Sequence, residues 1–130
     1  MIQVLTHSTV FVCPSVYEPM GIVNLEAMAC ETAVVATATG GIPEVVVDSA
    51  DDRATGRLVP IEQATDGTGT PLDPDRFVAD LASALSSVVA DQGRAAAMGA
   101  AGRRRAVEHF SWSSIAERTM EVYREVASAG

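Results

Sequence analysis

The stretch TVFVCPSVYEPMGIVNLEAMACETAVVATA, residues 9–38, decides the fold. Residues 9–14 are β-branched and aromatic and end at a proline, which is typical of a buried strand. Residues 22–30 carry apolar side chains at helical spacing, and residues 33–38 form a second apolar run. A strand, a helix and a strand in this order predict a right-handed, parallel βαβ unit.

The segment after this unit is broken by turn-forming residues. The glycine pair Gly40 and Gly41 interrupts the chain, and Pro43 predicts the first turn of a short helix through Val47. Next come an acidic loop and then a third, edge-like strand, followed by a long surface loop rich in glycine and proline; we assign these to residues 48–55, 56–60 and 61–74.

The second half of the sequence predicts helices. One opens at Asp73 and Pro74, a second covers residues 94–109 and is weakened by two glycines, and a third covers residues 111–126 with Ser111 or Ser113 as its N-cap. The predicted fold class is therefore α/β, a short parallel sheet with helices and a helical C-terminal segment. Doubly wound domains usually carry more strands, so we expect a partial Rossmann-like domain.

Composition excludes several classes of function. The 130 residues fit one domain, and a formal net charge of −8 disfavours a nucleic-acid partner. All nine basic residues are arginines, so mechanisms that need a lysine are excluded. The apolar runs are too short for a membrane span, and the N-terminus does not resemble a signal peptide. Cys13 and Cys30 lack metal-ligand spacing and predict buried, reduced thiols in a cytoplasmic protein.

Two carboxylates flank the start of the first predicted helix. Glu18 lies in the loop after the first strand, where open α/β sheets bind ligands, and Glu26 lies within the first two turns of the helix. Between them, unpaired backbone N–H groups attract anions, phosphates especially; these belong to Met20, Gly21, Ile22 and Val23. Carboxylates accept hydrogen bonds from paired hydroxyls. The combination suggests a nucleotide sugar.

Other interpretations of the two acids remain open. Glu18 is also a favourable charge near the positive end of a helix, and Glu26 is also consistent with a solvated helical residue. A glycosidase carboxylate pair is a third alternative, because the spacing in the sequence does not give the separation of the two groups in space.

The order of motifs supports the nucleotide-sugar interpretation. Glu18-Pro-Met-Gly21 followed by Glu26-Ala resembles the E-P-x-G-x-x-x-x-E-A signature of retaining GT-B glycosyltransferases, glycosyltransferase family 4. The segments TGGIPE, TGRLVP and FSW at residues 39–44, 55–60 and 110–112 are similar to later landmarks of the same family. The likeness is closest to bacterial glycogen synthases of the actinobacterial type, including those that make maltose 1-phosphate.

The resemblance implies an architecture of two Rossmann-like domains around a cleft, with the donor held mainly by the second. Residues 1–110 look like the latter half of that second domain, and residues 111–130 like the C-terminal helix that packs back on the first. The family's arginine and lysine that clamp the diphosphate would lie upstream, as would the acceptor domain. We therefore expect the isolated chain to be a C-terminal fragment without turnover.

The resemblance also implies a reaction and residue roles. Glucose would pass from ADP-glucose or UDP-glucose to an α-glucan or sugar acceptor with retention, without a metal or cofactor. Glu18 would bind the donor-sugar hydroxyls at the reaction centre, and Glu26 would hold the ribose. The backbone would meet the donor sugar or its phosphate at Met20, Gly21, Ile22 and Val23, whereas Thr39, Gly40 and Gly41 would line the diphosphate.

Some residues depart from the family or carry other expectations. Glu31 stands where relatives usually place a glycine, so a left-handed helix end there would be strained by about 1 kcal/mol. Residues 103–105, three arginines, predict a solvated helical face, and Phe110 with Trp112 are expected to anchor the bend before the last helix.

An alternative function belongs to another class. The partial sheet could serve only as a folding or oligomerisation module, without catalysis. Exposed sheet edges and the amphipathic last helix favour a homo-oligomer.

Overall fold

A three-stranded parallel sheet forms the centre of the chain in the computed structural model, which describes residues 1–128. Its strands lie in the order β1 (Val10–Cys13), β2 (Ala33–Thr37) and β3 (Gly56–Val59). Val12 pairs with Val35, and Val35 pairs with Arg57. The predicted βαβ unit is confirmed, with α2 (Ile22–Ala29) as its crossover helix. The fold class is α/β, as predicted.

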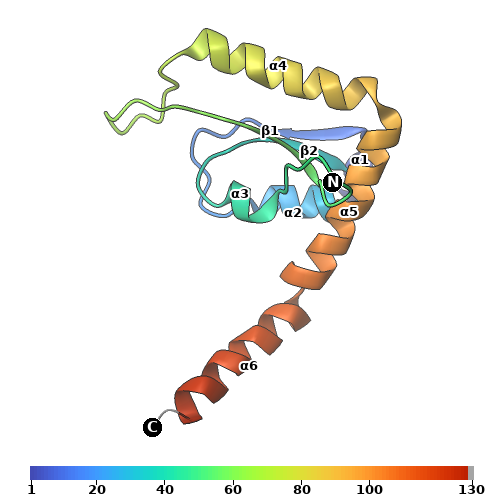
Figure 1. Cartoon of the computed structure of the whole chain (residues 1–130), viewed down its shortest axis with the longest axis vertical. Helices are drawn as coiled ribbons and strands as arrows, with labels where there is room; N and C mark the ends of the chain where they lie inside the picture. Colours follow the sequence, from blue (N-terminus) through green and yellow to red (C-terminus); the bar gives the residue numbers. More distant parts are fainter. Residues whose placement is uncertain (129–130) are drawn as a thin grey trace.

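Alternate residues of β2 face two separate cores. Val34 and Ala36 pack with residues of α2 and α3 (Ile42–Val45), whereas Ala33 and Val35 pack with residues of α4 (Pro74–Ala90). Figure 1 shows the sheet between α4 on one face and α2 with α3 on the other. All five residues of β2 are buried, which explains the unbroken apolar run of its sequence.

Helix α5 (Gln92–Phe110) runs past one end of the sheet and contributes to both cores. The sequence predicted that two glycines weaken this helix, but in the structure they also have a packing role. A β-carbon at Gly99 would overlap the carbonyl oxygen of Glu31, and one at Gly102 would lie 3.1 Å from Met28 Cγ. The two glycines therefore let α5 approach the C-terminal end of α2 closely.

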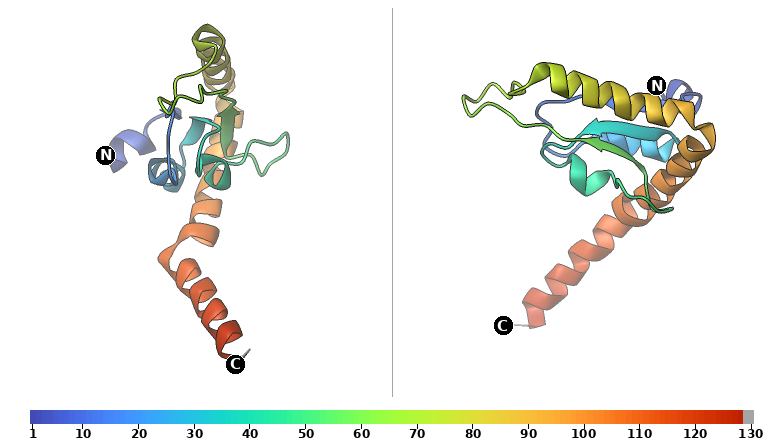
Figure 2. Two further views of the ribbon diagram at one scale, coloured as in Figure 1. Left: turned by 90° about the vertical axis from the view of Figure 1, so that its left-hand side faces the viewer. Right: turned by 45° about the horizontal axis from the view of Figure 1, so that its top comes forward.

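The last helix, α6 (Trp112–Ser128), extends away from the sheet (Figure 2). Ser111 caps it, because its hydroxyl accepts a hydrogen bond from the backbone N–H of Ser114 at 3.2 Å. Of the predicted C-terminal segment 111–130, residues 129 and 130 lie outside the described residues. The expectation that Trp112 anchors the bend is wrong, since its side chain is 87% exposed; Phe110 alone packs against the core.

Three further predictions differ from the structure. The helix α1 (Ile2–Thr6) has no counterpart among the predicted elements. Helix α3 ends at Val45, two residues before the predicted end, because the backbone becomes extended at Val46. Cys30 is only half-buried, whereas Cys13 is buried, and both are free thiols. None of the helices within residues 1–128 combines the length and apolarity that a bilayer crossing requires.

Candidate functional site

The loops that follow the three strands meet at one edge of the sheet. Parallel strands place their carboxyl ends at the same edge, and the loop after β1 is contacted there by the other two. The Thr39 hydroxyl donates to the carbonyl oxygen of Val16 at 3.5 Å, and the Gln63 side-chain amide donates to the same oxygen. The loops after β2 and β3 thus both contact the loop that contains Glu18.

Glu18 lies between two backbone segments. One carboxylate oxygen, Oε1, accepts hydrogen bonds from the N–H of Gly21 at 3.0 Å and of Met20 at 3.4 Å. The other oxygen, Oε2, has no hydrogen-bond partner among residues 1–128. The main-chain carbonyl of Glu18 accepts a 3.0 Å hydrogen bond from the N–H of Gly41. The half-buried side chain is therefore fixed through one oxygen while the other stays available.

This geometry modifies the expected anion site at the start of α2. Two of the four expected N–H groups, those of Met20 and Gly21, are already engaged by Glu18. Those of Ile22 and Val23 have no acceptor within the described part of the chain, as helix geometry requires of a first turn. Gly21 is the N-cap residue in the left-handed region, with φ 87°. The part of the anion site that remains free thus consists of two N–H groups beside a carboxylate.

The glycine pair holds this loop by close contact. A β-carbon at Gly40 would overlap the carbonyl oxygen of Glu18, and one at Gly41 would lie 2.5 Å from that of Pro19. Gly40 also has φ 52°, which other residues rarely adopt. These glycines are needed to bring the loops after β1 and β2 together, a role that the sequence analysis did not assign to them.

Glu26 lies one helical turn after Ile22, on the same face of α2, and is half-buried. The side chain of Glu26 forms no hydrogen bond or ion pair with the other residues of 1–128, although its main-chain carbonyl accepts a hydrogen bond from the N–H of Cys30. The structure therefore places Glu18 in the loop that leads into α2 and Glu26 on α2 itself, with the Glu18 side chain restrained by hydrogen bonds and the Glu26 side chain unrestrained.

Sequence reasoning missed Asn24. Its side chain is fully buried beside Gly21 and Ile42, and both amide atoms lack a partner among residues 1–128. A polar residue within the apolar run Ile22–Ala29 was the signal that could have revealed it. Two apolar side chains on the same loop and helix are exposed, Tyr17 at 78% and Ile22 at 59%.

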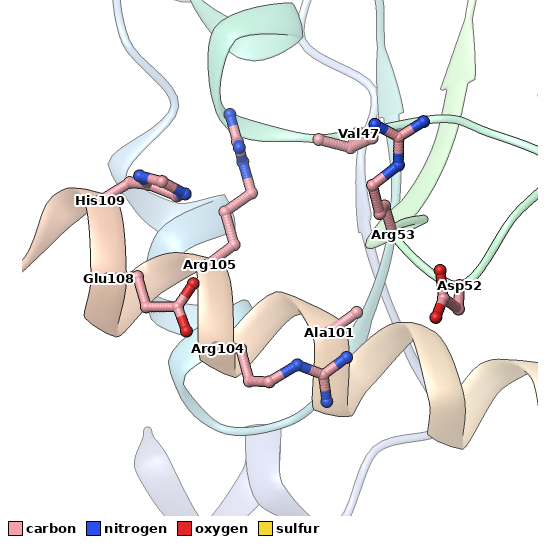
Figure 3. Close-up of a pocket in the computed structure, with 8 residues that line it drawn as sticks. All are labelled: Val47, Asp52, Arg53, Ala101, Arg104, Arg105, Glu108 and His109. Atoms are coloured by element: carbon pink, nitrogen blue, oxygen red, sulfur yellow. The ribbon is translucent and has the colours of Figure 1, made fainter.

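A cavity of about 440 Å³ lies elsewhere, between α5 and the segment after α3 (Figure 3). Its lining mixes charges of both signs: Val47, Asp52, Arg53, Ala101, Arg104, Arg105, Glu108 and His109. Arg53 is paired with Asp51 and, together with Ser49, holds the pKa of that carboxyl well below its usual range. Because this guanidinium is occupied and acids line the wall, the cavity is a poorer candidate for an anion than the sheet edge.

Comparisons with known proteins show similarity along nearly the whole chain. The chain is 53% identical over 126 residues to the alpha-maltose-1-phosphate synthase of Mycolicibacterium smegmatis. The aligned residues cover 97% of the chain and 30% of that protein. It is 33% identical over 123 residues to the glycogen synthase of Mycobacterium tuberculosis, covering 95% of the chain and 25% of that enzyme. The chain thus spans less than a third of these relatives' length.

A solved structure and a family model extend the likeness. The sucrose-phosphate synthase from Thermosynechococcus elongatus superposes with a TM-score of 0.72 at 35% identity, over 98% of this chain and 27% of that one. The model of glycosyl transferases group 1 matches residues 1–105, which include all three strands and both candidate carboxylates. The partial Rossmann-like sheet, the loop around Glu18 and this match together show that the chain belongs to the glycosyl transferases group 1 family.

Proposed function

We propose that the chain is the donor-binding part of a retaining, glycogen synthase-like glucosyltransferase. Glucose would pass from ADP-glucose or UDP-glucose to an α-glucan or sugar acceptor. The observation that carries this proposal is the arrangement of Glu18, fixed through Oε1 with Oε2 free, beside the unpaired N–H groups of Ile22 and Val23. The name of the M. smegmatis relative, an alpha-maltose-1-phosphate synthase, supports a glucosyl donor.

The residue roles follow from the chemistry of each group. Glu18 Oε2 would accept hydrogen bonds from sugar hydroxyls, and its negative charge would stabilise positive charge that develops at the reacting sugar carbon. Glu26, unrestrained on the next turn of α2, would bind the paired ribose hydroxyls. The N–H groups of Ile22 and Val23 would bind a phosphate oxygen. The further donor contacts are proposed at Met20, Gly21, Thr39, Gly40 and Gly41.

In a retaining transfer on one face of the sugar, the leaving phosphate itself assists deprotonation of the acceptor. The protein then contributes positioning and charge rather than a nucleophile or a base. This assigns Glu18 an electrostatic role and leaves acceptor binding to a preceding domain, against which residues 111–130 would pack. We further propose a cytoplasmic location for the whole enzyme.

Calorimetric titration of ADP-glucose, UDP-glucose and ADP into the chain tests the proposal. We expect binding at millimolar concentrations, weakened about tenfold by Glu18→Gln, which keeps the size of the side chain and removes its charge. Glu26→Ala should weaken binding similarly. Glu44→Ala is the matched control, because Glu44 is an exposed acid on α3. No heat of binding, or equal affinity in all variants, would refute the donor site.

A second candidate function is self-association. None of the residues of α6 is buried, and its exposed apolar side chains include Val122 at 55%, Tyr123 at 64% and Val126 at 70%. If these side chains mediate a homo-oligomer, sedimentation equilibrium should show a dimer or larger species that Val122→Glu dissociates. A monomer at all concentrations would leave donor binding as the remaining function.

A further inference from the structure

Helix α3 directly follows the glycine pair of the candidate site, yet it consists of only four residues. A helix of one turn is unstable by itself, because nucleation costs more backbone entropy than one hydrogen bond returns. The carbonyl groups at its C-terminal end also have no N–H donor within the helix. The position of α3 must therefore be set by groups outside it.

Groups from two distant segments hold the two ends of α3. At its N-terminal end, the N–H of Gly41 donates to the carbonyl oxygen of Glu18 at 3.0 Å. At its C-terminal end, Arg105 of α5 donates from Nε to the carbonyl oxygen of Val45 at 2.8 Å and from Nη2 to that of Glu44 at 2.7 Å. Figure 3 shows the Arg105 side chain reaching from α5 toward α3. The sequence expectation of a solvated face is therefore wrong for Arg105.

Arg105 is well suited to fix a neighbouring helix. Its guanidinium presents two donors in a planar fork and lies over the ring of Phe110, 5.5 Å from the ring centroid. It extends from α5, whose close contact with α2 depends on Gly99 and Gly102. A half-buried, doubly bonded cation on a packed helix restrains α3 more firmly than an exposed residue could.

The neighbouring arginines on α5 provide a contrast. The side chain of Arg104 is exposed and forms no hydrogen bond or ion pair with the residues that the structure describes. Arg103 donates to the carbonyl oxygen of Ala29, at the end of α2, and approaches Glu31 Oε1 at 3.6 Å. Only Arg105 of these three is bonded to α3 within residues 1–128.

We propose that Arg105 is a positioning residue for the candidate donor site. It holds the C-terminal end of α3, α3 holds Gly41, and Gly41 holds the main chain of Glu18. The expected effect of Arg105 on affinity for the nucleotide sugar rests on the proposed function. Its expected effect on the position of Gly41 does not. Because Arg105 is far from Glu18 in the sequence and would not touch the donor, its effect would be transmitted through α3.

Amide hydrogen exchange measured by NMR on the whole chain tests the first link. Arg105→Gln should accelerate exchange of the Gly41 and Val46 amides about tenfold or more, because two charge-assisted hydrogen bonds are lost. The amide of Val35 in the central strand β2 serves as the internal reference and should change little. Arg104→Gln, one residue away and exposed, is the control and should leave all three rates within about twofold.

Donor titration into the same variants tests the second link. Arg105→Gln should raise the Kd for the nucleotide sugar about threefold to tenfold, and Arg105→Lys, which keeps the charge but not the fork, should give an intermediate value. A uniform acceleration at Gly41, Val46 and Val35, or none at Gly41, would overturn the proposal, since Arg105 would then act only on global stability. Faster amide exchange confined to Gly41 and Val46, together with an unchanged Kd for the donor, would overturn the role of Arg105 at the donor site.

The two proposals fail in distinguishable ways. If the wild-type chain shows no donor binding, the proposed function fails, yet the exchange rates of Gly41 still decide whether Arg105 positions the loop. If the wild-type chain binds donor and Arg105→Gln matches it in both measurements, the donor site stands and the positioning role is refuted.

Discussion

Gly40 approaches the carbonyl oxygen of Glu18 so closely that no β-carbon fits between them. This contact joins the loop after β1 to the loop after β2, and with the hydrogen bond from Gly41 it fixes the main chain that carries the candidate catalytic carboxylate. The geometry of the candidate site therefore depends on backbone packing as much as on acidic side chains.

Gly40→Ala should destabilise the chain for two reasons, a clash and an unfavourable backbone conformation. The positive φ of 52° alone should cost about 1–2 kcal/mol, and overlap with Glu18 should add about 1–3 kcal/mol. Gly67→Ala is the control, since Gly67 has φ 82° but nothing within 4 Å of an added β-carbon. Urea unfolding measures both; equal losses would show that the loops separate readily and that the contact is not restrictive.

Glu31→Gly should stabilise the chain relative to Glu31→Ala by about 1 kcal/mol. Glu31 has φ 61°, as expected for a helix end where relatives place glycine. Both variants lose the exposed ion pair with Arg103, so their difference isolates the backbone strain. Thermal unfolding of the two variants side by side provides the measurement. If the alanine variant is as stable as the glycine variant, the left-handed conformation carries no cost here.

The strained helix end was predictable from the sequence because strain depends on one residue and its local conformation. The βαβ unit was predictable for a similar reason, since apolar periodicity over residues 9–38 reports local structure. Contacts between distant segments carry no such local signal. The bonds from Arg105 to Glu44 and Val45 span about sixty positions, and a run of three arginines gives no indication which one faces inward.

The same limit applies to the glycines of α5. Helix propensity alone predicts that Gly99 destabilises its helix. The tertiary structure instead requires a residue without a side chain at this position. Likewise, sequence reasoning placed Glu18 beside free N–H groups, but not its own side chain on two of them. The order of the elements could be predicted from the sequence, whereas the contacts between residues of distant segments could not.

Gly99→Ala and Gly93→Ala should have opposite effects on the free energy of unfolding. A β-carbon at Gly99 would overlap the carbonyl oxygen of Glu31, so this change should destabilise by about 1–3 kcal/mol despite better helix propensity. Gly93, in the first turn of the same helix, has only Asp91 Oδ1 nearby, at 3.5 Å, and its change should stabilise by up to about 1 kcal/mol. Stabilisation by both changes would contradict the close packing of α5 on α2.

Asn24→Asp and Ile22→Asp place the same charge at the same end of α2 with different burial. The helix dipole favours both by about 0.3–1 kcal/mol, but Asn24 is fully buried and Ile22 is 59% exposed. Burying an unpaired carboxylate costs several kcal/mol, which exceeds what the dipole returns, so Asn24→Asp should destabilise strongly at pH 7 and Ile22→Asp should not.

The pH dependence separates the burial of charge from a simple loss of packing. Burial would raise the folded-state pKa of an aspartate at position 24 above its unfolded value of about 3.9. Its destabilising effect should therefore be absent below about pH 4 and grow as the pH rises toward 7, because the unfolded state then gives up its proton more readily. Urea unfolding of wild type and Asn24→Asp between these pH values measures the difference in free energy. A difference that stays constant with pH would mean that the folded-state pKa is unshifted because the carboxylate reaches water, and that the interior beside Gly21 is more open than the structure shows.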